Sequence, residues 1–211
     1  MNRTKPKIAV ANYGMGNLRS VTKALEAVGA QIRLVTKPDE VSDVEGLVFP
    51  GVGALGDCVD ALQSSGLDGT IREWIRDDRP FLGVCLGLQA LFETSEEGET
   101  RGLGIFEGRV VRFRSDSLKV PHMGWNSVSF RPSARPLFGQ SDLDGQQFYF
   151  VHSYHVVPGD AGLIAGETTY GTRFTSVIAR GRCFATQFHP EKSQHAGLSL
   201  YRGFVALCVD T

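Results

Sequence analysis

Gly83-Val84-Cys85-Leu86-Gly87 decides the fold of this chain, because it joins a strand-like run to a helix-like run. The apolar pair Phe81-Leu82 precedes it, and the stretch from Leu86 to Phe92 follows with helical character. A reactive side chain between two glycines at a strand-to-helix turn has the form of a nucleophile elbow. The first N–H groups of a helix also stabilise a thiolate. Cys85 is therefore a candidate nucleophile, and a buried structural cysteine is the alternative.

A second segment, Ala185 to Lys192, supplies a candidate base. Residues two apart in an extended backbone project to the same side, roughly 6.6 Å apart along the strand. Pro190 disfavours helix at His189, so His189 and Glu191 are expected side by side. A base oriented by a carboxylate is what a thiol nucleophile needs. A solvated turn is the alternative, but partners of a nucleophile meet in space and not in sequence.

A third segment, Pro50-Gly51-Val52-Gly53, follows the short apolar run Gly46-Leu47-Val48-Phe49. Backbone N–H groups at Val52 and Gly53, with that of Leu86, are candidates for stabilising an oxyanion. Gly51 and Gly53 also allow a peptide to flip at low steric cost. Taken alone, the segment favours an ordinary β-to-α turn.

In this order, the three segments resemble the class I glutamine amidotransferases of the triad type, and the run from Gly83 to Gln89 sharpens the match. Further motifs are similar to those of the glutaminase subunits of imidazole glycerol phosphate synthase. The resemblance runs from about Ile8 to the end of the chain, and one departure is Asn12, where the family often has Asp. The further motifs are Asn12 to Leu18, Pro121 to Asn126 and Tyr149 to Tyr154.

The resemblance implies a reaction and a set of substrate contacts. Cys85 would attack the side-chain amide of glutamine, and His189, oriented by Glu191, would protonate the leaving ammonia and activate water. Gln89 would contact the substrate glutamine, one helical turn after the cysteine. The backbone around Ser153 and Tyr154 would hold the α-carboxylate and amino group. No cofactor is implied.

The resemblance also implies a partner, because a chain of 211 residues is too short for a second active site. A separate (β/α)8-barrel cyclase subunit would take the ammonia in a heterodimer of histidine biosynthesis. It would make imidazole glycerol phosphate and an aminoimidazole carboxamide ribotide. The family positions near the interface and the ammonia exit are Asn12, Trp125, Tyr149 and Lys192. Trp125, with Met123, is equally compatible with a docking face and with a core position.

Composition predicts one globular glutamine amidotransferase domain over residues 1–211, with 42% hydrophobic and 21% charged residues. A net charge of -1 without a basic run disfavours nucleic acid as a partner. No secretory or membrane-spanning run is found, so the four cysteines are expected as free thiols in the cytoplasm. We expect Cys58, Cys183 and Cys208 to pack in the core.

The histidines outside the triad segment do not predict a metal site. His152 and His155 are three apart in a strand-like segment, so we expect them on opposite faces. His122 and His195 have no matching carboxylate or thiol cluster, and we therefore assign no metal.

The alternation of strand and helix patterns before Gly108 predicts an α/β fold. We expect a mostly parallel central sheet with helices on both faces, of the flavodoxin-like class I amidotransferase type, extended by antiparallel strands. The expected strands are Lys7–Ala11, Gln31–Val35, Leu47–Phe49, Phe81–Val84, Arg109–Phe113, Asn126–Phe130, Gln147–His155, Gly162–Gly166, Phe174–Ala179 and Cys183–Gln187. The expected helices are Asn17–Val28, Leu55–Gln63, Leu67–Arg76 and Ser199–Cys208.

Three alternatives remain at this level. A glutaminase of pyridoxal phosphate, anthranilate or guanylate synthesis is disfavoured by the motifs at Pro50 and Pro121. A stand-alone cysteine hydrolase is disfavoured by Gln89 and by Glu191 two residues after His189. A non-catalytic regulatory subunit is disfavoured by the intact Cys85, His189 and Glu191.

Overall fold

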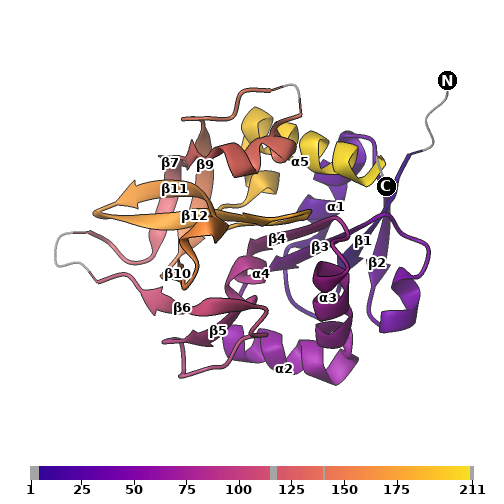
Figure 1. Cartoon of the computed structure of the whole chain (residues 1–211), viewed down its shortest axis with the longest axis horizontal. Coiled ribbons are helices and arrows are strands. Elements are labelled where there is room, and N and C mark those ends of the chain that lie inside the picture. The colour runs from indigo at the N-terminus through magenta and orange to yellow at the C-terminus, as the bar shows by residue number, and fades with distance from the viewer. Residues whose placement is uncertain (1–4, 115–117, 140, 210–211) are drawn as a thin grey trace.

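The elbow strand lies at the centre of a large mixed sheet (Figure 1), in a computed structural model that describes residues 5–114, 118–139 and 141–209. The strands are β1 Lys7–Ala11, β2 Gln31–Val35, β3 Gly46–Gly51, β4 Phe81–Cys85, β5 Phe92–Ser95, β6 Phe106–Arg112, β7 His122–Ser127, β8 Ser129–Phe130, β9 Gln147–His152, β10 Tyr154–Pro158, β11 Ile164–Tyr170, β12 Thr172–Arg180 and β13 Cys183–Thr186. The α-helices are α1 Leu18–Ala27, α2 Leu55–Ser65, α3 Leu67–Arg76, α4 Leu86–Gln89 and α5 Gln194–Val209. Short 3-10 helices are η1 Pro38–Val41, η2 Pro132–Phe138, η3 Ala161–Leu163 and η4 Pro190–Lys192.

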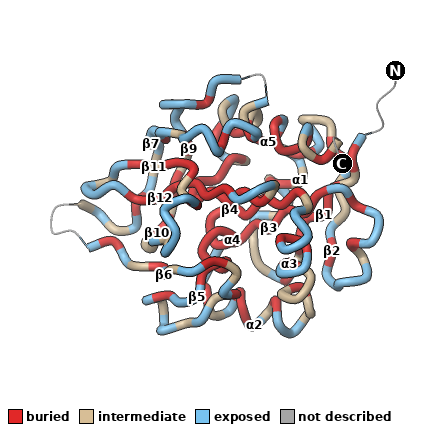
Figure 2. Tube along the Cα trace, viewed as in Figure 1, coloured by how far each residue is buried: buried red, intermediate tan, exposed pale blue. Residues whose placement is uncertain are grey.

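Five neighbouring strands, β2, β1, β3, β4 and β13, run parallel. Their side chains alternate between two cores, so that Ala9 of β1 packs with α2 and α3 while Ile8 packs with α1 and α5. The helices therefore cover both faces of buried strands (Figure 2). The predicted parallel sheet with helices on both faces is confirmed.

The antiparallel extension begins at β12, which pairs with β13, β10 and β11. The path then continues through β6 to β5, and β7 pairs with β9 in a separate two-stranded sheet. The predicted extension is thus confirmed. None of the helices in the described ranges combines the length and apolarity needed to cross a membrane.

The predicted strand Gln147–His155 is in fact two strands in different sheets. The chain leaves the small sheet after His152 and enters the main sheet at Tyr154, where Tyr154 pairs with Arg112. Ser153 lies at this crossing. The predicted strand Asn126–Phe130 is likewise divided between β7 and β8 around Val128. Both errors have one cause, because alternation identifies a strand but does not say with which neighbour it pairs.

The predicted helix after Cys85 is much shorter than its apolar content suggests. α4 ends at Gln89, and Phe92 begins β5, which pairs with β6 from Phe106 onward. A short apolar run is ambiguous between helix and strand, and here the tertiary pairing decides. The other differences are at ends: β6 starts at Phe106, β11 runs from Ile164 to Tyr170, and α5 begins at Gln194.

Candidate active site

Cys85 ends β4 in a strained backbone conformation, with φ 55° and ψ -103°. A non-glycine residue with positive φ between strand and helix is the geometry of a nucleophile elbow. Gly87 makes the turn possible, because a Cβ there would lie 2.0 Å from the Phe49 carbonyl oxygen. Cys85 thereby lies at the carboxyl end of the central strand β4 and is 7% exposed.

His189 and Glu191 lie side by side, as the segment predicted, but not on one extended strand. β13 ends at Thr186, and Pro190 begins the 3-10 helix η4, where its fixed φ suits the first helical position. His189 Nδ1 lies 2.8 Å from Glu191 Oε1, and both side chains are 2% exposed. Tyr201 Oη donates to the other carboxylate oxygen at 3.5 Å.

The charge of His189 is set by its two neighbours. Burial alone would lower the pKa of His189, but the adjacent Cys85 sulfur and the Glu191 carboxylate outweigh it and raise that pKa to about 10. Its Nε2 is buried and has no hydrogen-bond partner among the described residues. The adjacent sulfur therefore favours the protonated imidazole, and Nε2 is the ring nitrogen that Glu191 does not occupy.

A cavity of about 330 Å³ brings most of the predicted site residues together. Its wall includes Cys85 and His189, and Glu191 stands behind His189. Gly51 does not share this wall and lies at the end of β3, where it pairs with Cys85. The predicted residues on the wall are Val52, Gly53, Cys85, Leu86, Gln89, Ser153, Tyr154 and His189, and the others are Glu97, Pro121, Val151 and His152.

Three side chains at this site were not assigned from the sequence. Glu97 puts a carboxylate into the cavity wall, and its Oε2 accepts from the Leu55 N–H at 2.9 Å. His152 donates from Nδ1 to the Tyr154 carbonyl at 2.7 Å. Gln187 Nε2 lies 3.6 Å from Cys85 Sγ. Gln187 alone had a sequence signal, since it stands two residues before His189.

Three of the four predicted interface residues lie close together, and the fourth lies on a loop. Trp125 and Tyr149 face each other across β7 and β9 with ring centroids 6.1 Å apart, and Lys192 Nζ lies 5.7 Å from the Tyr149 ring centroid. Trp125 is 47% exposed and Met123 62% exposed, so a core position for Trp125 is wrong. Asn12 lies on the loop after β1, where its Oδ1 accepts from the Gly14 N–H.

The expectation that His152 and His155 point to opposite faces is wrong. Their ring centroids lie 5.2 Å and 4.6 Å from that of Phe113, because the chain changes sheets between them. The described residues contain no group of three or more histidine, cysteine, aspartate or glutamate side chains suited to a metal ion.

The cysteines outside the elbow pack in the core, as predicted. Cys58, Cys183 and Cys208 are all at most 1% exposed. Cys58 and Cys183 carry free thiols, and Cys208 Sγ donates to the Phe204 carbonyl at 3.3 Å. Burial raises the pKa of Cys58 to about 12, which makes this thiol a poor nucleophile.

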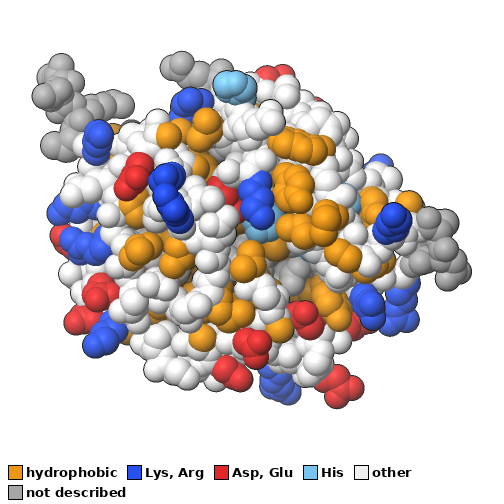
Figure 3. Space-filling view, turned by 180° about the vertical axis from the view of Figure 1, so that it is seen from behind, with side chains coloured by type: hydrophobic (Ala, Val, Ile, Leu, Met, Phe, Trp, Pro, Cys, Tyr) orange, Lys and Arg blue, Asp and Glu red, His pale blue; other side chains and the backbone are white. Residues whose placement is uncertain are grey.

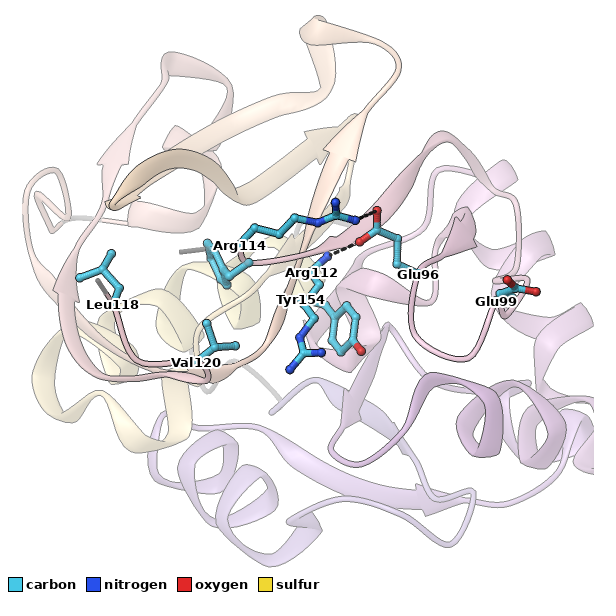
Figure 4. Close-up of a pocket in the computed structure, with 8 residues that line it drawn as sticks. Glu96, Glu99, Arg112, Arg114, Leu118, Val120 and Tyr154 are labelled. Carbon is cyan, nitrogen blue, oxygen red and sulfur yellow. Dashed lines mark hydrogen bonds and ion pairs between the residues drawn. The ribbon is translucent and has the colours of Figure 1, made fainter. Parts of the chain in front are cut away.

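A second cavity of about 780 Å³ adjoins the first at Tyr154 (Figure 4). Glu96 accepts there from the backbone N–H of Arg112 at 2.9 Å and from the Arg114 guanidinium at 3.3 Å. None of the described residues that line it is a cysteine, serine or histidine. The candidate nucleophile Cys85 and the candidate base His189 both line the smaller cavity.

Comparison with known proteins places this geometry in a family. The family model of class-I glutamine amidotransferases matches residues 9–206. Solved structures with this fold include PurLQS from Thermotoga maritima, with a TM-score of 0.77 at 18% identity over 96% of this chain and 98% of that one. A glutamine amidotransferase from the same organism gives a TM-score of 0.66 at 13% identity, over 98% of this chain and 99% of that one.

Curated relatives are much closer in sequence. Imidazole glycerol phosphate synthase subunit HisH of Chromobacterium violaceum is 50% identical over 95% of this chain and 97% of its own length. The protein of the same name from Thermosynechococcus vestitus is 50% identical over 97% and 99%. The chain therefore belongs to the class I glutamine amidotransferases and, within them, to the HisH subunits of imidazole glycerol phosphate synthase.

Proposed function

We propose that Cys85, His189 and Glu191 form the catalytic triad with which this glutaminase subunit hydrolyses glutamine. The observation that carries the proposal is the strained elbow of Cys85 in the same cavity wall as His189, which is paired with the buried Glu191 carboxylate. The Cys85 thiolate attacks the side-chain amide carbon and forms a tetrahedral intermediate. His189 Nε2 protonates the departing ammonia and then takes a proton from the water that hydrolyses the thioester.

The remaining wall of the cavity suits the two ends of a glutamine. The carboxylate of Glu97 offers a partner for the α-ammonium group, and the backbone at Ser153 and Tyr154 holds the α-carboxylate. Both hydrogens of Gln89 Nε2 are used within the protein, so Gln89 offers its Oε1 to the substrate. The N–H groups of Val52, Gly53 and Leu86 stabilise the oxyanion.

The ammonia passes, in this proposal, to a separate (β/α)8-barrel cyclase subunit that completes imidazole glycerol phosphate synthesis in the cytoplasm. Trp125 and Met123 form an exposed apolar surface on β7, beside the active-site wall at Pro121. On the face turned away in Figure 1, hydrophobic side chains gather beside lysine and arginine side chains (Figure 3). We assign the β7–β9 surface to docking, with Asn12, Tyr149 and Lys192 near the ammonia exit.

The test is Cys85→Ala in the complex with the cyclase. Glutamine-dependent turnover should be lost, by orders of magnitude, because the nucleophile is absent. Turnover supplied with free ammonium should remain, because the cyclase does not use Cys85. Glutamine-dependent turnover at the wild-type rate in this variant would show that the nucleophile lies elsewhere.

A further inference from the structure

A side-chain amide outside the triad lies directly beside the proposed nucleophile. Gln187 is fully buried just after β13, and its Nε2 lies 3.6 Å from Cys85 Sγ. We propose that Gln187 is a further catalytic residue, whose side-chain N–H donates a hydrogen bond to the Cys85 sulfur and stabilises it as the thiolate. The inference rests on the proposed function only in that Cys85 must be the nucleophile.

The orientation of the Gln187 amide follows from a backbone carbonyl, which can only accept. Gln89 Nε2 donates to the Tyr154 carbonyl at 3.0 Å, and this contact fixes which end of the Gln89 amide is nitrogen. The second hydrogen of the same nitrogen points to Gln187, 3.1 Å away, so the Gln187 atom there must be the acceptor Oε1. Gln187 Nε2 is therefore the end that meets the sulfur, and it meets it as a donor.

A buried thiolate needs such a donor. A charge taken out of water is costly unless it is hydrogen-bonded, and the Cys85 side chain is only 7% exposed. His189 supplies positive charge nearby, but in the proposed reaction it gives its proton to the departing ammonia. The Gln187 amide is neutral and does not titrate near neutral pH. It can therefore hold the sulfur throughout the cycle, while His189 gives up and regains its proton.

Two substitutions separate this role from simple packing. Gln187→Met keeps the size but removes both polar ends. Gln187→Glu keeps an oxygen that accepts from Gln89 Nε2 and replaces the donor beside the sulfur with a second oxygen. If Gln187 served only to anchor Gln89, Gln187→Glu would be close to wild type. If Gln187 stabilises the thiolate, Cys85 is less reactive in both variants. The loss in Gln187→Glu is at least as large as in Gln187→Met, because the glutamate carboxylate repels the negative sulfur.

The measurement is the rate of alkylation of Cys85 by iodoacetamide, followed by peptide mass spectrometry across a series of pH values, with the chain in its complex with the cyclase. Both variants should react roughly 10- to 100-fold more slowly near neutral pH, the range for losing a hydrogen bond to a charged group. The rates should approach that of wild type at high pH, where the thiolate forms without help. Glutamine-dependent turnover should fall in parallel.

Thr186→Val is the matched control, because Thr186 is also fully buried and its hydroxyl donates to the Phe188 carbonyl and not to the sulfur. It should leave the alkylation profile unchanged. Complex formation and thermal unfolding show whether each variant is folded. If Gln187→Glu does not fold, Gln187→Met alone provides the test. An unchanged alkylation profile in a folded Gln187 variant would overturn the inference. Glutamine turnover by Cys85→Ala would instead overturn the proposed function, so the two failures are distinct.

Discussion

At the scale of single residues, His189 and Glu191 present different atoms to the reaction. One oxygen of the Glu191 carboxylate binds His189 Nδ1, and the other accepts from Tyr201 Oη. Both carboxylate oxygens therefore have a partner within the protein, and the carboxylate is suited to orient the imidazole. Nε2 of His189 is the atom left for proton transfer. In the proposed triad, the carboxylate therefore acts through the imidazole and the imidazole acts on the substrate.

This difference predicts unequal losses on substitution. Glu191→Gln should lower the glutaminase rate on the order of 10⁴-fold, and His189→Ala on the order of 10⁶-fold, as in other triads. Glutamine hydrolysis by the complex, with free-ammonium turnover as the control for cyclase integrity, measures both. Equal rates for wild type and His189→Ala would remove the base assignment.

Cys85, His189 and Glu191 were predictable because each stands in a local pattern that constrains its own backbone. Glu97 was not, because it meets the N-terminus of α2 only after β5 pairs with β6, a contact that spans 42 residues of sequence. Gln187 had a local pattern, but its role depends on an amide orientation that the Tyr154 carbonyl sets from another strand.

At the scale of elements, the crossing from β9 to β10 is held by a chain of buried imidazoles. His152 Nδ1 donates to the Tyr154 carbonyl, so its Nε2 must accept from His122 Nδ1, 3.0 Å away. His122 Nε2 then accepts from Asn126 Nδ2 at 3.3 Å. This arrangement requires both rings to be neutral, since a protonated ring would have no acceptor to offer.

Acid should therefore weaken this part of the fold. Burial lowers the pKa of His122 to about 4 and that of His152 to about 3. The unfolded chain binds protons on these rings below about pH 6.5, whereas the folded chain does not, so stability falls as pH decreases through this window. For His152 alone, the loss between about pH 7 and pH 5 is at most about 2 kcal/mol.

Denaturant unfolding of wild type and of His152→Gln, at about pH 7 and about pH 5, measures the contribution of His152 to this loss of stability. His189 has a raised pKa and opposes the trend, because its contribution is present at low pH and is lost as pH rises towards 10. The comparison is therefore made between chains that share His189. His152→Gln should lose less stability on acidification than wild type, and the exposed His195→Gln should behave as wild type. An equal loss in His152→Gln would contradict the role given to this ring.

The elements that form the parallel half of the sheet were largely predictable, and those that close the site were not. β1, β3 and β4 are mostly apolar runs, so their place in a buried sheet follows from composition. The crossings at Val128 and Ser153 carry no such mark, because the same alternation suits either sheet. The crossing at Ser153 nevertheless brings His152 and Tyr154 to the cavity.

At the scale of the whole molecule, the cavity lies where the carboxyl ends of β3 and β4 meet the small sheet of β7 and β9. Open α/β sheets bind ligands at the carboxyl ends of their strands. Here the small sheet also carries the exposed Trp125 and Met123, so a partner seated there would contact the same elements that line the cavity. The proposed docking surface and the proposed active site are therefore neighbours in this molecule.

That proximity predicts that the isolated chain is a poor glutaminase and is activated by the cyclase with its acceptor nucleotide. Gly53 has φ +107°, and Val52 is 38% exposed at the cavity, so the peptide between them can rotate with little steric cost. If its N–H faces away from the oxyanion at rest, the missing donor costs roughly a hundredfold to a thousandfold in rate. A partner that favours the other orientation raises turnover with little change in glutamine binding, because the interaction belongs to the transition state.

The measurement is glutamine hydrolysis by the chain alone, with the cyclase, and with the cyclase plus acceptor nucleotide. Trp125→Ala should weaken the rise, because it removes an anchor of the docking surface. Leu34→Ala is the matched control, since Leu34 is also 47% exposed but lies on β2, an edge strand of the main sheet and not of the small sheet of β7 and β9. Full activity of the chain alone would exclude the rotating peptide as a switch. An equal rise in Trp125→Ala and Leu34→Ala would place docking on another surface.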